Sequence, residues 1–254
     1  MAGPRKRPGR GVRAPPRAGG DGRTKRLKTA KGRGLSSTRW LTRQIRDPYV
    51  AAARDQGLRS RAAFKLMELD DRFRFLKPGR QVVDLGAAPG GWCQVAAERV
   101  KLGRPGGGRV VAVDCEEMDP VPGVIHLTLN FLDADAPERV RAALEGPADV
   151  VLSDMAAPAT GHAQTDHLRI MALLEAAYAF ARTVLAPGGV LVGKVLRGGA
   201  EKALLTALKH DFAEVRHVKP PASRKESAEI YIVALGFRGG FRGADTGGDS
   251  TGGD

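Results

Sequence analysis

Short runs of consecutive apolar residues recur between about residues 35 and 236, separated by longer segments with a helical repeat. Continuous apolar runs, as opposed to strict alternation of apolar and polar residues, are typical of strands that are covered on both faces. The strands predicted in this way are residues 81–85, 109–114, 124–129, 149–154, 190–196, 214–218 and 229–235.

Segments with helical periodicity lie between most of these strands, and the longest ends before Pro187-Gly188-Gly189, which stops a helix. The order predicts an α/β fold, with a mostly parallel, doubly wound sheet of seven strands and helices on both faces. Only residues 219–228 separate the last two strands, too few for a crossover helix, so the last strand should run antiparallel. The predicted helices are residues 60–75, 91–101, 137–144, 165–185 and 200–210.

Positive charge is concentrated at the start of the chain. The 254 residues include 41 Lys+Arg and 28 Asp+Glu, and residues 1–34 hold twelve of the basic side chains with one acid, Asp21. This segment is rich in Gly and Pro and poor in large apolar side chains, so we predict a disordered basic arm. Clustered Lys and Arg favour a polyanion-binding arm over a merely solvated tail, because phosphate backbones release counterions on binding.

The Gly-rich end of the chain, residues 237–254, is predicted to be a second disordered tail, which leaves residues 35–236 as the folded domain. Weak RNA-contact potential is assigned there to Phe237, Arg238, Phe241 and Arg242.

Composition argues against several classes of protein. No apolar run approaches the roughly 18 residues that cross a bilayer, and no hydrophobic stretch follows the basic N-terminus as in a signal peptide. Two cysteines, Cys93 and Cys115, cannot supply a disulfide framework or a four-thiolate zinc site, and the five His lack metal-ligand spacing. We expect a cytoplasmic protein without a metal. Organelle import stays open, although Gly and Pro disfavour an amphipathic transit helix.

A glycine-rich turn follows the first predicted strand, in the motif VVDLGAAPGGW of residues 82–92. Ligands of open α/β sheets bind beyond the carboxyl ends of the strands, and such a turn lets backbone N–H groups approach them. The second strand ends at Asp114, which is suited to accept hydrogen bonds from two ribose hydroxyls. The turn and the acid together predict a nucleoside cofactor.

The turn lacks the G-x-G-x-x-G spacing of a dinucleotide site, which argues against NAD and favours S-adenosylmethionine. Two further residues each have a functional and a structural interpretation. Asn130 could contact the adenine or cap the loop before Phe131, and Trp92 could flank the adenine or fill the core under the turn.

Charged residues stand at the ends of otherwise apolar strands: Asp154 after DVVLS, Lys194 within VLVGKVL and Glu229 before IYIVAL. An unpaired buried charge is costly, so such residues are usually paired or functional. Because the last strand runs in the opposite direction, its start lies at the same edge as the ends of the other two. The three side chains are therefore predicted to meet, either as a catalytic group or as a structural ion-pair cluster.

An ordered series of motifs resembles the bacterial FtsJ/RlmE (RrmJ) family of ribosomal RNA large-subunit ribose methyltransferases. The resemblance covers about residues 39–235 and its length makes it specific. The motifs are RWLTRQIRDPYVAAARDQGLRSRAAFKL, VVDLGAAPGGW, MDP, SDMAAPATG, LAPGG, VGKVL and SAEIYIVA.

The resemblance implies a Rossmann-like class I methyltransferase that uses S-adenosylmethionine, without a metal, to 2′-O-methylate a uridine in the A loop of 23S ribosomal RNA. It implies a catalytic set of Lys65, Asp154, Lys194 and Glu229, of which Lys65 was not placed by the strand pattern. It also implies cofactor contacts at Gly90, Trp92, Asp114 and Asp154, with Asn130 where the family usually has Asp.

Methyl transfer to a hydroxyl needs chiefly a base and alignment. We assign Lys194 as the base, Asp154 as the group that orients it, and Lys65 and Glu229 as groups that fix the ribose. Adjacent carboxylates favour the cation of Lys194, while burial and Lys65 favour the neutral amine, so a role as a steering cation stays open.

The substrate is predicted to be ribosomal RNA in the large ribosomal subunit, bound by a monomer. The basic arm and an arginine-rich segment after it both support an RNA substrate. Two alternatives remain: the same chemistry on transfer RNA or messenger RNA caps, and a non-catalytic RNA-binding ribosome-assembly factor. The arginines of that segment are Arg39, Arg43, Arg46, Arg54, Arg59 and Arg61.

Overall fold

The computed structural model describes residues 47–198 and 202–239. The predicted basic arm, the first three arginines of the segment after it, and Phe241 and Arg242 lie outside these residues. The strands are β1 (Gln81–Leu85), β2 (Arg109–Asp114), β3 (Ile125–Thr128), β4 (Ala148–Ser153), β5 (Leu185–Leu196), β6 (Phe212–Val218) and β7 (Glu229–Phe237). The helices are α2 (Pro48–Asp55), α3 (Ala62–Phe73), α4 (Gly91–Arg99), α5 (Ala136–Leu144), α6 (Ala163–Val184) and α7 (Lys202–Asp211).

The strands form one seven-stranded sheet in the order β3-β2-β1-β4-β5-β7-β6. The pairs among β1 to β5 are parallel, and β7 runs antiparallel to both β5 and β6. The predicted fold class, including the reversed last strand, is therefore confirmed. The strand order changes direction between β1 and β4, and the crevice beyond the carboxyl ends of such a pair is where open α/β sheets bind ligands.

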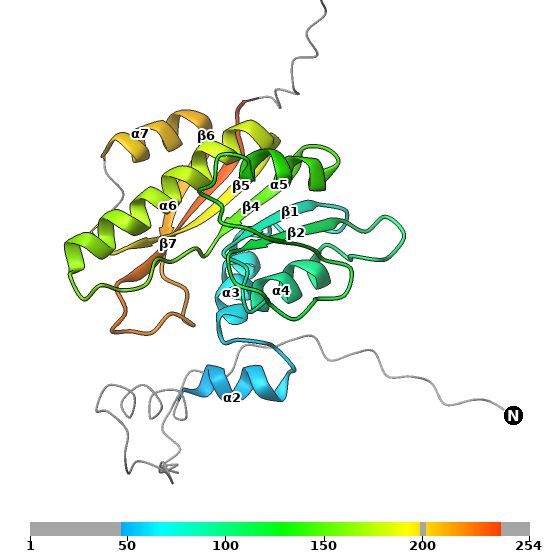
Figure 1. The fold of residues 1–254 in the computed structure, drawn as a ribbon, viewed down its shortest axis with the longest axis horizontal. Helices are drawn as coiled ribbons and strands as arrows, with labels where there is room; N and C mark the ends of the chain where they lie inside the picture. Colours follow the sequence, from blue (N-terminus) through cyan, green and yellow to red (C-terminus); the bar gives the residue numbers. More distant parts are fainter. Residues whose placement is uncertain (1–46, 199–201, 240–254) are drawn as a thin grey trace, which may run out of the picture.

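Helices cover both faces of the sheet (Figure 1), with α5, α6 and α7 on one face and α3 and α4 on the other. Successive strand residues serve these two layers in turn: Val83 packs in the core under α6, and Val82 in the core under α3. This double coverage explains the continuous apolar runs, because side chains on both faces of a strand must be apolar.

The last strand continues beyond its predicted end at residue 235. Phe237 is 5% exposed and its ring centroid lies 5.3 Å from that of Phe212. Arg238 Nη1 donates to the carbonyl oxygens of Lys209 at 2.9 Å and His210 at 2.7 Å. The prediction that a disordered tail begins at residue 237 is therefore wrong for these two residues. The Gly-rich composition of the segment gave no indication that the Phe237 ring is buried or that the Arg238 guanidinium caps the end of a helix.

Helix α2 was not predicted. The Asp47 side chain accepts the N–H of Tyr49 at 3.0 Å, and Pro48 occupies the first turn, which are both start signals of a helix. The strand predicted from residue 190 begins earlier, at Leu185, directly after α6. No helix in residues 47–198 and 202–239 has the length and apolarity to span a membrane.

Candidate active site at the carboxyl edge of the sheet

The ends of β1 and β4 touch where the strand order reverses. The N–H of Asp154 donates to the carbonyl oxygen of Leu85 at 3.0 Å. Gly86, the next residue, has a φ of +79°, and a Cβ built on it would lie 2.7 Å from the Cα and N atoms of Met155. Only glycine fits between these two backbones, so the glycine-rich turn begins in direct contact with the segment that carries Asp154.

The structure brings together the four charged residues predicted to be catalytic. Lys194 Nζ lies 3.1 Å from Asp154 Oδ1 and donates to the Asp154 carbonyl oxygen at 2.6 Å. Lys65 Nζ lies 2.8 Å from Glu229 Oε2 and 4.0 Å from Asp154 Oδ2. The two acidic and two basic side chains thus alternate around one site.

Each of the four reaches the site from a different element. Lys65 lies in the first turn of α3, Asp154 follows β4, and Lys194 is within β5. Glu229 is the first residue of β7 and pairs in register with Leu196, near the end of β5. The antiparallel direction of β7 therefore brings Glu229 to the edge where the parallel strands end, as the strand pattern predicted.

The site is largely shielded from solvent, with Lys65 8% and Lys194 9% exposed. Burial by itself would raise the pKa of Asp154, but Lys65, Lys194 and the Tyr231 hydroxyl outweigh it and lower that pKa. Asp154 is consequently an anion, and it attracts the side-chain amines of Lys65 and Lys194.

Tyr231 belongs to the same cluster and was not predicted. Its hydroxyl donates to Asp154 Oδ1 at 2.8 Å and accepts from Lys65 Nζ at 3.2 Å. The side chain is fully buried, and burial together with the charges of Asp154 and Glu229 raises its pKa well above the usual value, so it stays a neutral phenol. Its position two residues after Glu229, on the same side of the strand, is the signal that could have identified it.

The cofactor residues predicted at the glycine-rich turn lie together at the start of α4. Gly90 caps this helix with a φ of +101°. Asp114, at the end of β2, accepts the N–H of Ala88 through Oδ2 at 2.8 Å and that of Glu116 through Oδ1 at 2.9 Å. The turn and the acid that was predicted to bind ribose are thus held together directly.

Asp84, the acid that opens this turn, is fully buried. Its Oδ2 accepts from the thiol of Cys93 at 3.1 Å, whereas Oδ1 has no hydrogen-bond partner. Burial raises the pKa of Asp84 to about 7, the Cys93 hydrogen bond opposes this rise, and the nearby charges of Asp154 and Asp114 add to it. A buried acceptor without a partner next to a glycine cradle fits a site that receives a polar or cationic ligand.

The side chains of Trp92 and Asn130, each of which has a functional and a structural interpretation, both make contacts within the protein. Trp92 is 3% exposed, donates from Nε1 to the Ala62 carbonyl at 2.8 Å and packs against Tyr231. Asn130 is exposed, and its amide accepts the N–H of Leu132 at 3.2 Å and donates to Asp133 at 3.0 Å. The first fills the core under the turn and the second caps its loop.

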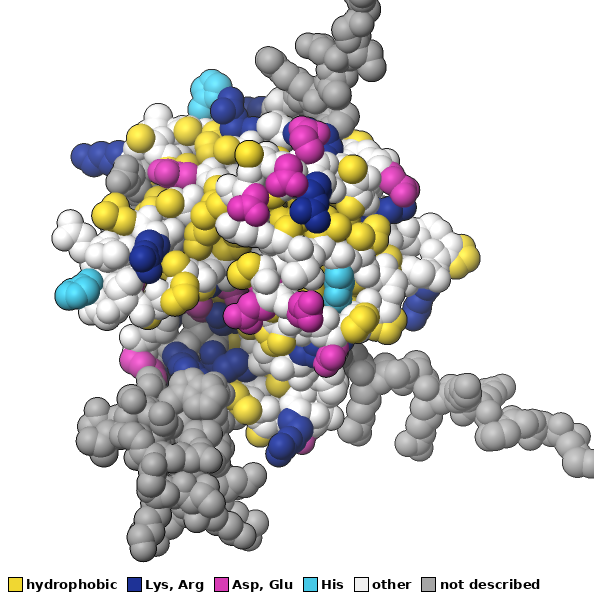
Figure 2. Space-filling view, in the orientation of Figure 1, with side chains coloured by type: hydrophobic (Ala, Val, Ile, Leu, Met, Phe, Trp, Pro, Cys, Tyr) yellow, Lys and Arg dark blue, Asp and Glu magenta, His cyan; other side chains and the backbone are white. Residues whose placement is uncertain are grey.

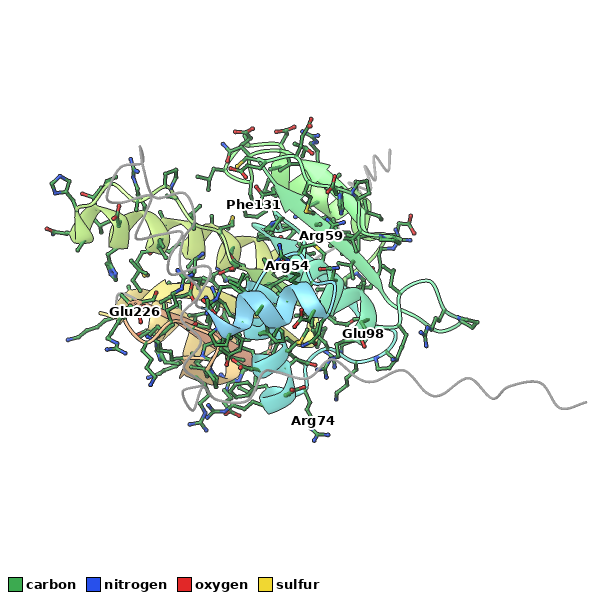
Figure 3. All side chains as sticks on the ribbon, turned by 90° about the horizontal axis from the view of Figure 1, so that it is seen from below. Arg54, Arg59, Arg74, Glu98, Phe131 and Glu226 are labelled. Carbon is green, nitrogen blue, oxygen red and sulfur yellow. The ribbon has the colours of Figure 1, made fainter. Side chains whose placement is uncertain are left out.

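Arg59 also contacts the glycine-rich turn, which the sequence did not suggest. Its guanidinium donates to the carbonyl oxygens of Pro89 at 3.2 Å and Pro120 at 2.7 Å, and also to that of Asp119. A Cβ on Gly90 would lie 2.8 Å from Arg59 Nη1. Figure 3 shows Arg59 on the side of α2 that faces the segment carrying Phe131. Arg59 therefore fastens the turn to the loop after β2.

Both cysteines are free thiols, Cys93 buried and Cys115 exposed. Within the described part of the chain, no group of three or more His, Cys, Asp and Glu has the arrangement of a metal site.

A family model described as FtsJ-like methyltransferase matches residues 58–237, which is more than half of the chain. The chain belongs to the FtsJ-like methyltransferase family. It is 60% identical over 238 residues to ribosomal RNA large subunit methyltransferase E of Paramagnetospirillum magneticum, covering 93% of this chain and 98% of the relative. The protein of the same name from Parvibaculum lavamentivorans is 62% identical over 220 residues, covering 84% and 87% of the two chains.

A solved structure from Plasmodium falciparum, described as that of a ribosomal RNA methyltransferase, is also similar. It aligns with a TM-score of 0.61 and 33% identity, over 71% of this chain and 99% of that one. The matched family region contains all four charged residues of the site. The site lies at the carboxyl ends of the parallel strands, where open α/β sheets bind their ligands.

Proposed function

We propose that this protein transfers a methyl group from S-adenosylmethionine to a ribose 2′-hydroxyl of ribosomal RNA in the large ribosomal subunit, at a uridine of the A loop. The observation that carries the proposal is the cluster of Lys65, Asp154, Lys194 and Glu229 at the point where the strand order reverses. The names of the relatives support the RNA class.

The residues around the glycine-rich turn suit the cofactor. S-adenosylmethionine supplies an electrophilic methyl group on a cationic sulfur. Asp114 retains lone pairs for ribose hydroxyls, because each carboxylate oxygen accepts only one backbone N–H here. Gly90 lets the backbone approach the ligand, and Trp92, whose indole is buried, would contribute through its main chain. Asn130 would approach the adenine only by releasing its loop contacts.

Lys194 is the side chain best placed to receive or steer the hydroxyl. Two hydrogen-bonding positions of its amine are directed at the oxygens of Asp154, which leaves one position for a substrate. Asp154 fixes the position of the Lys194 amine. The conformational entropy of aligning this amine with the hydroxyl is therefore lost on folding and not during the reaction. Lys65 and Glu229, linked at 2.8 Å, would hold the ribose on the other side of Asp154.

RNA binding would draw on fewer of the predicted arginines than the sequence suggested. Arg59 is committed to the glycine-rich turn, and Arg61 pairs with Asp47 at 2.8 Å. Arg54 is exposed and remains available for phosphates, together with the basic arm outside the described residues. Figure 2 shows Lys and Arg side chains gathered low on this face, near α2. Monomeric state and cytoplasmic location stay predictions.

The test is methyl transfer from labelled S-adenosylmethionine to unmodified large ribosomal subunits, to free 23S RNA, to transfer RNA and to capped messenger RNA. We expect label only in the large-subunit RNA, on one ribose, which mapping of the methylated nucleotide would place at an A-loop uridine. Label on transfer RNA or a cap would replace the substrate assignment. RNA binding without any transfer would establish the assembly-factor alternative.

A further inference from the structure

The loop of residues 219–228, which joins β6 to β7, is fastened to α3 at one residue. The N–H of Ala222 donates to Glu68 Oε2 at 2.6 Å, and its carbonyl oxygen accepts from Arg61 Nη2. Ala222 is fully buried, so neither contact competes with water. Glu226 marks this loop in Figure 3. The loop backbone is therefore held in a fixed place beside the active site.

Ser223 follows this fixed point and extends toward the site. It is 4% exposed, and its N–H donates to the Pro220 carbonyl at 2.9 Å. Its hydroxyl donates to Glu229 Oε1 at 2.8 Å, while Lys65 donates to Glu229 Oε2 at the same distance. Ser223 and Lys65 therefore hold opposite oxygens of the Glu229 carboxylate, and of these two residues only Lys65 belongs to the predicted catalytic set.

We propose that Ser223 is a positioning residue for methyl transfer, whose hydroxyl fixes the Glu229 carboxylate and, through it, the ammonium group of Lys65. The proposal rests on the proposed function, because it assigns Ser223 a role in that same site. A carboxylate held at both oxygens has one orientation, whereas loss of the Ser223 contact leaves Oε1 free to turn. Lys65 lies 2.8 Å from Glu229 and 4.0 Å from Asp154, so rotation would change which acid it contacts.

Ser227, in the same loop, provides a matched control. Its hydroxyl accepts the main-chain N–H of Glu229 at 3.2 Å, whereas the Ser223 hydroxyl donates to the Glu229 carboxylate. Ser223→Ala and Ser227→Ala therefore each remove one hydroxyl that contacts the same glutamate. Only the first removes a contact to the carboxylate itself.

The experiment measures single-turnover methyl transfer to large ribosomal subunits, S-adenosylmethionine affinity by calorimetry, and thermal unfolding, for wild type, Ser223→Ala, Ser223→Thr and Ser227→Ala. We expect Ser223→Ala to slow transfer about 10-fold because the Glu229 carboxylate loses its fixed orientation, with the cofactor Kd nearly unchanged and Tm lowered by only a few degrees. Ser223→Thr, which keeps the hydroxyl, should recover most of the rate, and Ser227→Ala should match wild type.

Crystal structures of wild type and Ser223→Ala give a readout that does not depend on activity. The variant should show the Glu229 carboxylate turned away from its wild-type orientation. An unmoved carboxylate, a Ser223→Ala rate within twofold of wild type, or an equal loss in Ser227→Ala would overturn the positioning role. A wild-type protein that methylates none of the RNAs would instead overturn the proposed function, and the two failures are thus distinguishable.

Discussion

The Tyr231 hydroxyl donates to Asp154 Oδ1 at 2.8 Å, the same carboxylate oxygen that faces Lys194 Nζ at 3.1 Å. The Tyr231 hydroxyl and the Lys194 amine therefore share a single acceptor oxygen. Because the Tyr231 ring also packs against the ring of Trp92 in α4, one buried side chain contacts both the charged cluster and the helix that follows the glycine-rich turn.

Removal of that hydroxyl should slow the reaction without unfolding the protein. For Tyr231→Phe we expect a loss of about 10-fold in the methyl-transfer rate, since a hydrogen bond to a charged group is removed while the ring stays packed. Tyr178→Phe is the matched control, because its hydroxyl donates to Asp211 at 2.6 Å away from the site. Equal rates for Tyr231→Phe and wild type would contradict a role for the Tyr231–Asp154 bond.

Asp84 should make stability depend on pH. Its pKa is raised to about 7 in the folded protein, so between the usual Asp value of about 3.9 and 7 the folded state binds more protons than the unfolded state. Its contribution to stability is complete below about pH 4 and is lost as the pH rises through about 7.

Asp84→Asn removes this titration. The stability of the variant relative to wild type, measured as the difference in the free energy of unfolding, should be greater at pH 8 than at pH 5 by roughly 2 to 4 kcal/mol in urea titrations. Asp55→Asn, which removes a carboxyl at an exposed position, is the control for the substitution itself. Parallel pH curves for wild type and Asp84→Asn would show that the carboxyl is charged in the fold.

Gly86 should tolerate no side chain. Gly86→Ala places a Cβ 2.7 Å from the Met155 backbone, whereas Gly103, which also has a positive φ, has nothing within 4 Å of its Cβ position. Gly103→Ala reports backbone strain alone, about 1 kcal/mol. Gly86→Ala should cost at least about 2 kcal/mol more in urea unfolding and abolish cofactor binding, because the ends of β1 and β4 must separate. Similar losses in both variants would disprove the close contact.

Cofactor affinity should depend on Asp114 far more than on Asn130. Asp114→Ala removes a carboxylate that is aligned by two backbone N–H groups, and we expect the Kd for S-adenosylmethionine to rise by roughly 10-fold or more. Asn130→Ala removes a loop cap on an exposed side chain, and Kd should change by less than about threefold. Calorimetric titration compares the two variants, and a larger effect of Asn130→Ala than of Asp114→Ala would instead support a contact between Asn130 and the adenine.

The sheet and the meeting of Asp154, Lys194 and Glu229 could be predicted because strand direction alone decides them. Apolar runs mark the strands, a short loop reverses β7, and polarity then places each charged end at one edge. Lys65 lies on a helix outside the sheet, so the strand pattern does not place it at this edge. Only the family resemblance identified Lys65 as a member of the site.

The partners of Arg59 and Ser223 could not be predicted from the sequence. In the sequence Arg59 is one of several basic residues. In the fold its guanidinium donates hydrogen bonds to three backbone carbonyl oxygens in loops far away along the chain. Ser223 can reach the Glu229 carboxylate because the preceding residue, Ala222, is held by Glu68 of α3 and by Arg61 at the start of that helix. Such contacts depend on the packing of segments far apart in the chain, whereas local patterns report on neighbouring residues.

The most direct test of the account is the single-turnover rate of methyl transfer to large ribosomal subunits by Lys194→Ala and Lys194→Arg, with the exposed Lys77→Ala as control. We predict that both Lys194 variants lose activity by roughly 10²-fold or more while their Kd for S-adenosylmethionine stays close to that of wild type. Near wild-type transfer by either variant would contradict the assignment of Lys194 to the reacting hydroxyl.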